Sequence, residues 1–193
     1  MPLLTTDQRN DAWHQARKGK ITASLAAACL GLDPHKGPYW AWQEIQGRHQ
    51  QPVNRHMAWG TEFEPVARRW YEDEMGEIVE QTGFWVHKDY PWLGASPDGL
   101  VGDDGLLEVK VPTTIPSEVP VHHEIQCRIQ LAVLDRHWVD YLAWGHEGHF
   151  LKRIERIKGD LLMPPELMIL DMLLSFYLAY IVPDVAPPKR RKK

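Results

Sequence analysis

The residues best suited to chemistry in this chain are one aspartate, one glutamate and one lysine. Asp98 lies in the turn-forming sequence SPDGL at 96–100, and Glu108 and Lys110 alternate along a segment that favours a β-strand. Because successive side chains of a strand point to opposite faces, Glu108 and Lys110 share one face. Carboxylates are ligands for Mg²⁺ or Mn²⁺, and a lysine beside them can orient an attacking water or offset charge on a phosphodiester. The pattern indicates metal-assisted phosphodiester hydrolysis; the alternative is a surface hairpin with solvated charges.

The metal site that this pattern predicts uses Asp98, Glu108 and the backbone carbonyl of Val109, which lies between the two strand side chains. Waters and a phosphate oxygen would fill the remaining positions around Mg²⁺. A metal-bound water would be the nucleophile, within reach of Lys110. Pro97-Asp98 followed by Glu108-Val109-Lys110 matches the PD-(D/E)XK nuclease pattern, whose core is restriction-endonuclease-like.

Two further candidates lie on predicted helices. In the helix predicted over 54–75, apolar residues at helical spacing predict one buried stripe, made of Trp59, Phe63, Val66, Ala67 and Trp70. Glu64 lies at the edge of that stripe, where it faces a cleft or is an ordinary solvated glutamate. Gln126 lies on the helix predicted over 122–134, and it either orients a water or phosphate at the rim of the site or faces solvent.

Arg17 and Ser24 are candidates for binding a phosphate near the start of the chain. Arg17 precedes Gly19, and Ser24 opens a predicted helix, whose first N–H groups attract anions together with an arginine and a hydroxyl. The alternative is an ordinary helix cap. Trp13 or Trp40 could stack on nucleic-acid bases, but the sequence does not select between them.

The remaining elements predict a mixed β-sheet flanked by helices, an α/β fold. Helices are expected over 7–17, with Thr6 or Asp7 as cap, and over 25–30, 39–45 and from 164–165 to 181. Strands are expected over 83–87, 92–95, 99–101, 106–111, 138–144 and 150–157, with a hairpin turn at 103–105 and loops over 47–52 and 113–120.

Composition predicts a single nuclease domain over 1–182 and a proline-rich, then basic tail over 183–193, which we expect to be disordered. The formal net charge is −4, but residues 189–193 are all basic, and without them 17 basic residues face 26 acidic ones. An acidic body argues against general coating of DNA and permits a local basic groove. The tail either attracts phosphate or only keeps the end of the chain soluble.

Cysteine usage and hydropathy predict a cytoplasmic protein. Cys29 and Cys127 lie in apolar helical segments without a CxxC pair, which argues against zinc or iron–sulfur binding and for a reducing compartment. The first residues lack a signal-peptide pattern. The apolar run at 167–182 is too short to span a bilayer and predicts a buried or oligomer-facing helix.

Four blocks of the chain, in order, resemble the YqaJ-like viral recombinase family, which includes the phage lambda exonuclease and lies within the PD-(D/E)XK superfamily. The blocks are RKGKITAS at 17–24, AWGTEFE at 58–64, SPDGL at 96–100 with LEVK at 107–110, and QCRIQL at 126–131. The likeness runs over about residues 9–157. Arg128 stands where relatives often have glutamine, and the basic tail is not part of the pattern.

The resemblance implies a Mg²⁺-dependent 5′→3′ exonuclease that digests double-stranded DNA from its ends and leaves 3′ overhangs for recombination by single-strand annealing. It implies that Asp98 and Glu108 bind the metal, that Glu64 assists through bound water, and that Lys110 and Gln126 position the nucleophile. Arg17 and Ser24 match positions that hold the 5′-terminal phosphate. A homotrimer, a single-strand annealing partner and a phage- or prophage-encoded protein in the bacterial cytoplasm are also implied.

Two other functions remain open at this point. The same core could support a structure-specific or restriction-like endonuclease, which would cut a closed circle. A catalytically inactive protein that binds DNA ends is the non-enzymatic alternative, and intact Asp98, Glu108 and Lys110 argue against it.

Overall fold

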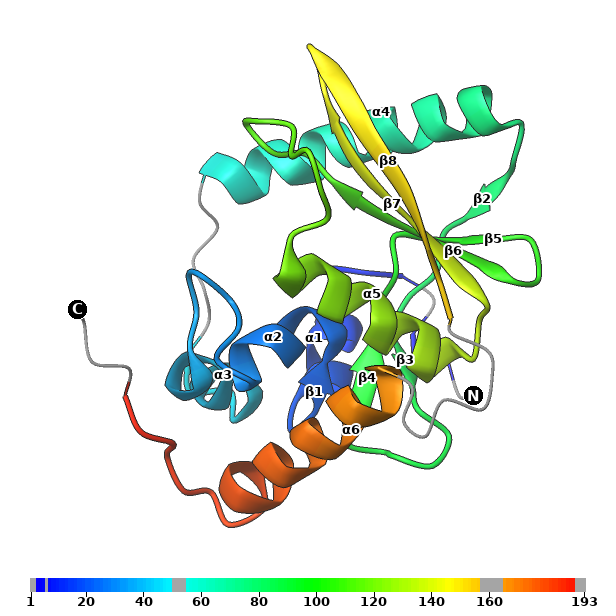
Figure 1. Cartoon of the computed structure of the whole chain (residues 1–193). Helices are drawn as coiled ribbons and strands as arrows, with labels where there is room; N and C mark the ends of the chain where they lie inside the picture. The colour runs from blue at the N-terminus through cyan, green and yellow to red at the C-terminus, as the bar shows by residue number, and fades with distance from the viewer. Residues whose placement is uncertain (1–2, 6, 50–54, 157–164, 190–193) are drawn as a thin grey trace.

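The computed structural model describes residues 3–5, 7–49, 55–156 and 165–189, which form two mixed β-sheets flanked by helices (Figure 1). The larger sheet has the strand order β2-β5-β6-β7-β8, with β2 Val79–Glu80, β5 Gly99–Val101, β6 Gly105–Lys110, β7 Trp138–Gly145 and β8 Gly148–Glu155. The smaller sheet has the order β1-β4-β3, with β1 Ile21–Thr22, β4 Leu93–Ala95 and β3 Trp85–Val86. The helices are α1 Asp11–Arg17, α2 Ala23–Cys29, α3 Pro38–Ile45, α4 Arg55–Met75, α5 Val121–Leu134 and α6 Pro165–Phe176. The predicted α/β class is confirmed.

The connection between β6 and β7 creates the frame of the site. β5 and β6 form an antiparallel hairpin around residues 102–104, whereas β6 and β7 pair in parallel. A parallel pair needs a crossover, and α5 supplies it. The helix that carries Gln126 is therefore held against the strand that carries Glu108 and Lys110.

Each face of the larger sheet has its own apolar core. Leu106, Val139 and Tyr141 pack with α2, α5 and α6 on one face, and Leu107, Val109 and Leu142 pack with α4 on the other. The alternation along β6 and β7 follows the two-residue period of a strand. Figure 1 shows the result, with α4 on one side of the strands and α5 on the other.

The predicted elements are present with shifted ends. α1 begins at Asp11 rather than at residue 7, because the Asn10 side chain caps it and accepts a hydrogen bond from Trp13 N at 2.8 Å. Thr6, one of the two predicted caps, lies outside the described residues. β1 and β2 were not predicted, since two residues are too few to show a period. The predicted positions 50–52, 54, 157 and 164 lie outside the described residues.

The buried stripe predicted for α4 is wrong in part. Ala67 and the unpredicted Tyr71 are fully buried against the sheet, whereas Trp59 is 41 % and Val66 48 % exposed. Trp59 is exposed because the first half of α4 lies beside segments that follow the ends of β6 and β7, not beside the strands. Val66 is exposed because it points away from the face on which Ala67 and Tyr71 are buried. Helical spacing identifies one face of a helix but not how far along the helix its neighbours extend.

The apolar C-terminal run is a helix, as predicted, but it has two parts. α6 ends at Phe176, and a π-helical segment, Tyr177–Ile181, follows. Leu170 and Leu173 are buried, while Met168 and Met172 are half exposed. Among the described residues no helix has the length and apolar character that a bilayer crossing requires.

Residues 182–189 continue along α3 without helix or strand. Asp184 forms an ion pair with Arg48, and Lys189 Nζ lies 4.7 Å from the centroid of the Tyr39 ring. The division into a domain over 1–182 and a tail stays a prediction, and residues 190–193 lie outside the described residues.

Candidate active site at the end of strand β6

Glu108 is the centre of a buried polar network between β6 and α5. Its side chain is 2 % exposed. Oε1 accepts hydrogen bonds from Lys110 Nζ and, at 2.6 Å, from Gln126 Nε2, and Oε2 accepts one from Gln130 Nε2. The structure therefore places Glu108 and Lys110 on one face of β6 and turns Gln126 toward them rather than toward solvent.

The charge of Lys110 is stabilised by its surroundings. Burial alone would lower the pKa of this ammonium, but Glu108 and Asp98 beside it outweigh burial and raise the pKa above its ordinary value. Lys110 is therefore a permanent cation at neutral pH. Such a group can donate to a water or offset charge on a phosphate, and it cannot act as a base.

Asp98 is fixed to the same strand by its backbone and its side chain. Its N–H donates to Leu107 O at 3.0 Å, and its Oδ2 accepts from Val109 N at 2.7 Å. Burial, together with Glu108 and Glu64, raises the pKa of Asp98 well above its usual range. The predicted aspartate and glutamate are thus close enough to repel one another.

Glu64 approaches from α4, on the rim of a cavity of about 490 Å³ that Asp98 and Arg68 also line. Its side chain is 16 % exposed and forms an ion pair with Arg9. Glu64 is therefore neither core nor freely solvated, and its charge acts on Asp98. Arg9 was not predicted, because an isolated arginine before a helix carries no signal of its partner.

The donor set fits a hard divalent cation. Within residues 3–5, 7–49, 55–156 and 165–189, no three His, Cys, Asp or Glu side chains are grouped to hold a metal ion. Mg²⁺ does not need such a cage, since it usually takes one or two carboxylates, waters and substrate oxygens. The mutual repulsion of Asp98 and Glu108 shows that two carboxylates converge here with a single lysine. The site therefore has the acid oxygens that a divalent cation takes as ligands.

Arg17 and Ser24 are brought together through Thr22, which the sequence analysis did not select. Arg17 Nη2 donates to Thr22 Oγ1 at 3.5 Å, and this hydroxyl lies 3.2 Å from Ser24 Oγ. Burial lowers the pKa of Arg17 to about 10, against the opposing effect of Glu44. A half-buried guanidinium beside two hydroxyls is suited to a phosphate.

Trp13 lies between the Arg17–Thr22–Ser24 cluster and the segment that carries Asp98. Its ring lies 4.0 Å from the Arg17 guanidinium, and its Nε1 donates to Ser96 Oγ at 2.9 Å, two residues before Asp98. Trp40, the other tryptophan proposed for base stacking, lies against Lys36 and His49. Both rings therefore already have protein partners.

From the sequence, Gln130 has the same two interpretations as Gln126, facing solvent or orienting a water, but it was not selected as a site residue. It is fully buried and lies one helical turn after Gln126, so the i, i+4 spacing of two glutamines was a usable signal. Arg128, between them, instead pairs with Glu124 on its own helix and joins α5 to α6 through Glu166, each at 2.8 Å. The departure at Arg128 therefore lies in a helix–helix contact and not among the groups that bond Glu108.

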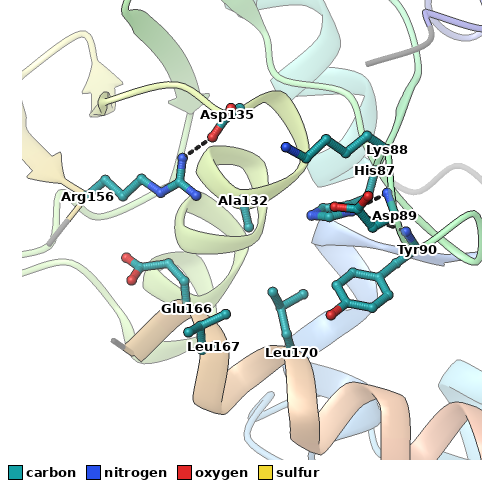
Figure 2. Close-up of a pocket in the computed structure, with 10 residues that line it drawn as sticks. All are labelled: His87, Lys88, Asp89, Tyr90, Ala132, Asp135, Arg156, Glu166, Leu167 and Leu170. Carbon is teal, nitrogen blue, oxygen red and sulfur yellow. Dashed lines mark hydrogen bonds and ion pairs between the residues drawn. The ribbon is translucent and has the colours of Figure 1, made fainter. Parts of the chain in front are cut away.

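A separate cavity of about 380 Å³ lies between α5, α6 and the loop after β3 (Figure 2). Figure 2 shows the Arg156–Asp135 ion pair on one side, with His87 and Tyr90 on the other and Glu166 below. None of the residues predicted for catalysis, metal or phosphate lines it. We therefore place the candidate site at β6.

The crossover of α5 between two parallel strands, with an acid and a lysine at the end of the first, defines the restriction-endonuclease-like class of α/β folds. Within that class, residues 12–137 match the YqaJ-like viral recombinase domain, and the chain belongs to this family.

The alkaline exonuclease LHK-Exo from Laribacter hongkongensis has a similar structure, with a TM-score of 0.74, 32 % identity and coverage of 91 % of this chain and 94 % of that one. Protein D345L of African swine fever virus (strain Badajoz 1971 Vero-adapted) is 36 % identical over 102 residues, and YqaJ of Bacillus subtilis (strain 168) is 26 % identical over 141 residues. These matches cover 48 % and 67 % of this chain, but only 28 % of D345L and 44 % of YqaJ.

Proposed function

We propose that the protein is a Mg²⁺-dependent 5′→3′ exonuclease that digests double-stranded DNA from its ends and leaves 3′ single-stranded overhangs. The observation that carries the proposal is the buried network of Glu108 with Lys110 and Gln126, next to the repelling carboxylate of Asp98. The likeness to an alkaline exonuclease over 91 % of the chain supports nuclease activity.

In this proposal Asp98, Glu108 and the Val109 carbonyl hold the cation, for which Mn²⁺ can substitute. When bound, such a cation would supply a water of lowered pKa and would neutralise charge on the phosphate. Lys110 donates to the attacking water or to the phosphate, and Gln126 orients the same water from α5. Glu64, at the cavity rim, assists through a bound water. Arg17, Thr22 and Ser24 hold the 5′-terminal phosphate, which sets the direction of digestion.

The biological setting is also part of the proposal. Overhangs of this polarity are substrates for a single-strand annealing protein, and we propose such a partner in phage-type recombination. We propose a homotrimer around the DNA, for which the half-exposed Met168 and Met172 of α6 offer apolar surface. The buried free thiols of Cys29 and Cys127 agree with expression from a phage or prophage in the bacterial cytoplasm.

Digestion of linear duplex DNA labelled at the 5′ or the 3′ end, with Mg²⁺, tests the activity and its direction. The 5′ label should be released first, and replacement of Lys110 or Glu108 by alanine should abolish release. Lys152→Ala and Glu155→Ala on the exposed β8 are matched controls that should retain it. Retained activity in the Lys110 or Glu108 variants contradicts the assignment. Cutting of a covalently closed circle would indicate the endonuclease, and binding without digestion the inactive end-binding protein.

The role of Arg17 is tested with ends that carry a 5′-phosphate or a 5′-hydroxyl. The unchanged protein should digest the phosphorylated end faster, and Arg17→Ala should remove the difference while leaving the slow rate on hydroxyl ends. Lys18→Ala, at the next residue, is the charge-matched control. Equal rates on both ends in the unchanged protein would remove the proposed phosphate role from Arg17.

A further inference from the structure

An exposed aromatic cluster lies between α4 and the β7–β8 turn. The rings of Trp59 and Phe63 have centroids 4.1 Å apart, and His146 lies 5.9 Å from the first ring and 5.1 Å from the second. Trp144 continues the group, 5.6 Å from His146. Trp59 is nevertheless 41 % exposed. Large aromatic side chains usually contribute to stability through burial, so this cluster leaves a substantial part of that area in water.

The cluster borders a cavity of about 690 Å³. Its walls come from the start of α4, the segment 112–115 that follows β6, and the turn 145–147. This volume lies within the range of about 300–1,000 Å³ that is typical of ligand sites. Of the four rings only Trp59 and His146 line the cavity, together with the apolar Pro112 and Ile115, and Arg55 and Glu147 supply one charge of each sign.

The elements that border the cavity also carry residues of the candidate active site. Pro112 follows Lys110 by two residues, and Glu64 follows Trp59 by five residues on the same helix, about 7–8 Å along its axis. The candidate phosphate site of Arg17, Thr22 and Ser24 is instead built from α1, β1 and α2. A DNA strand that spans the Arg17 group and Glu108 therefore leaves the aromatic cavity open to other nucleotides.

We propose that this cluster stacks on an unpaired nucleobase beside the cleavage site, which stabilises the separated end of the duplex. The inference rests on the proposed function, because an exonuclease that acts on duplex DNA generates unpaired bases where it cuts. Every base has a π-face, so an aromatic ring can hold it whatever the sequence, with a stabilisation of about 1–3 kcal/mol per base. Arg55 lies where it can meet the adjoining phosphate.

Trp59→Leu and Trp70→Leu form a matched pair of variants for the test. Trp70 lies on the same helix and also pairs with a histidine, His149, at 4.2 Å between centroids, but it does not border the cavity. Binding would be measured in Ca²⁺ without cleavage, with blunt duplexes and with duplexes that carry a 3′ extension. 2-Aminopurine in either strand would report which base is stacked.

Trp59→Leu should weaken binding of the extended duplex by about 5- to 100-fold, change blunt-duplex binding much less, and abolish 2-aminopurine quenching. Trp59→Phe should restore quenching, and Trp70→Leu should change neither quantity. Equal weakening on both duplexes, or no weakening, overturns the proposal. If Trp59→Leu unfolds, His146→Ala and Phe63→Leu are read by the same criteria. Because binding is measured without turnover, its outcome is independent of whether the protein digests DNA.

Discussion

Two buried carboxylates lie on neighbouring strands and face opposite sides of the sheet. Glu108 on β6 and Asp140 on β7 are each 2 % exposed, and Asp140 pairs in register with Leu107, the residue before Glu108. Asp140 meets α4: both of its oxygens accept from Arg153 at 2.8 Å, and Oδ2 also accepts from Tyr71 at 2.7 Å. Glu108 meets α5 and two glutamines, with one lysine shared with Asp98.

Burial of an acid does not by itself identify an active site. The charge of Asp140 is matched by one guanidinium in a bidentate geometry, with a tyrosine closing the remaining side. Around Glu108, two carboxylates, Glu108 and Asp98, share one lysine. Glu64 pairs with Arg9, and Arg68 bonds Asp98 only at its backbone carbonyl. We interpret the first site as structural and the second as prepared for a ligand that brings positive charge.

The largest effect is expected from Asp98→Asn. Asparagine keeps an acceptor for Val109 N but removes the charge needed for the cation, so digestion should fall by about 10³-fold or more. In EDTA the free energy of unfolding should stay equal or rise, because repulsion with Glu108 and Glu64 is relieved. Digestion assays and urea denaturation measure the two quantities. If the Asp98→Asn variant loses enough free energy of unfolding to leave little folded protein in the assay, the lost digestion reflects a structural role of Asp98.

Asp140→Asn should give the opposite result. Loss of the bidentate pair leaves Arg153 and the Tyr71 hydroxyl poorly matched, and the free energy of unfolding should fall by about 2–3 kcal/mol. Digestion per folded molecule should not change. Glu155→Gln, on the exposed side of β8, is the control for charge alone. If the Asp140→Asn variant is inactive but as stable as the unchanged protein, Asp140 has a role in activity and is not merely structural.

A smaller effect is expected from Gln126→Met, which keeps the volume but removes the donor to Glu108. The rate at saturating DNA should fall by about tenfold, the low end of the range for residues that orient a metal ligand. Arg128→Met, two residues along α5, should instead lower stability, because it breaks the contact with Glu166. Equal catalytic losses in both variants would argue against a specific role for Gln126.

The smallest effect concerns pH and His123, which lies on the same face of the sheet as Glu108 and 2.8 Å from the Tyr141 hydroxyl. Burial, with the charges of Lys110 and His122, lowers the pKa of His123 to about 3. The unfolded chain, with a histidine pKa of about 6.5, then binds more protons, so this residue makes stability fall as pH drops from about 6.5 toward 3.

His123→Gln should therefore reduce the loss of stability between pH 7 and pH 5, measured as the shift of the urea midpoint. His14→Gln, at an exposed position of α1, should leave that shift as it is. An unchanged shift in His123→Gln would mean that the destabilisation at low pH arises elsewhere.

Much of the candidate site was predictable because its residues lie close together in the sequence, within one strand and one turn. Glu108 and Lys110 share a face through strand alternation alone, and the turn at 96–100 places Asp98 beside the same strand. Arg17 and Ser24 were identified by block resemblance, but their link through Thr22 was not, since hydroxyl contacts have no period in the sequence. Arg9 and Glu64, 55 residues apart, could be joined only by the fold.

The errors in the fold prediction have the same origin. The stripe on α4 was assigned to one continuous core, although the sheet covers only the helix around Ala67 and Tyr71. Trp59 was therefore predicted to be buried, and its exposure is what makes the aromatic cluster available. Periodicity is a local property, whereas the extent of a neighbouring sheet is set by residues far along the chain.

Strand β6 serves both faces within six residues: Leu107 and Val109 contact the α4 side, and Glu108 and Lys110 the α5 side. Shifting the register of the strand by one residue would exchange the two sets, bringing leucine to the candidate site and glutamate into the apolar core. Substitutions among apolar residues of β6 can thus be tolerated, whereas the insertion or deletion of one residue would turn the following side chains to the opposite face of the sheet.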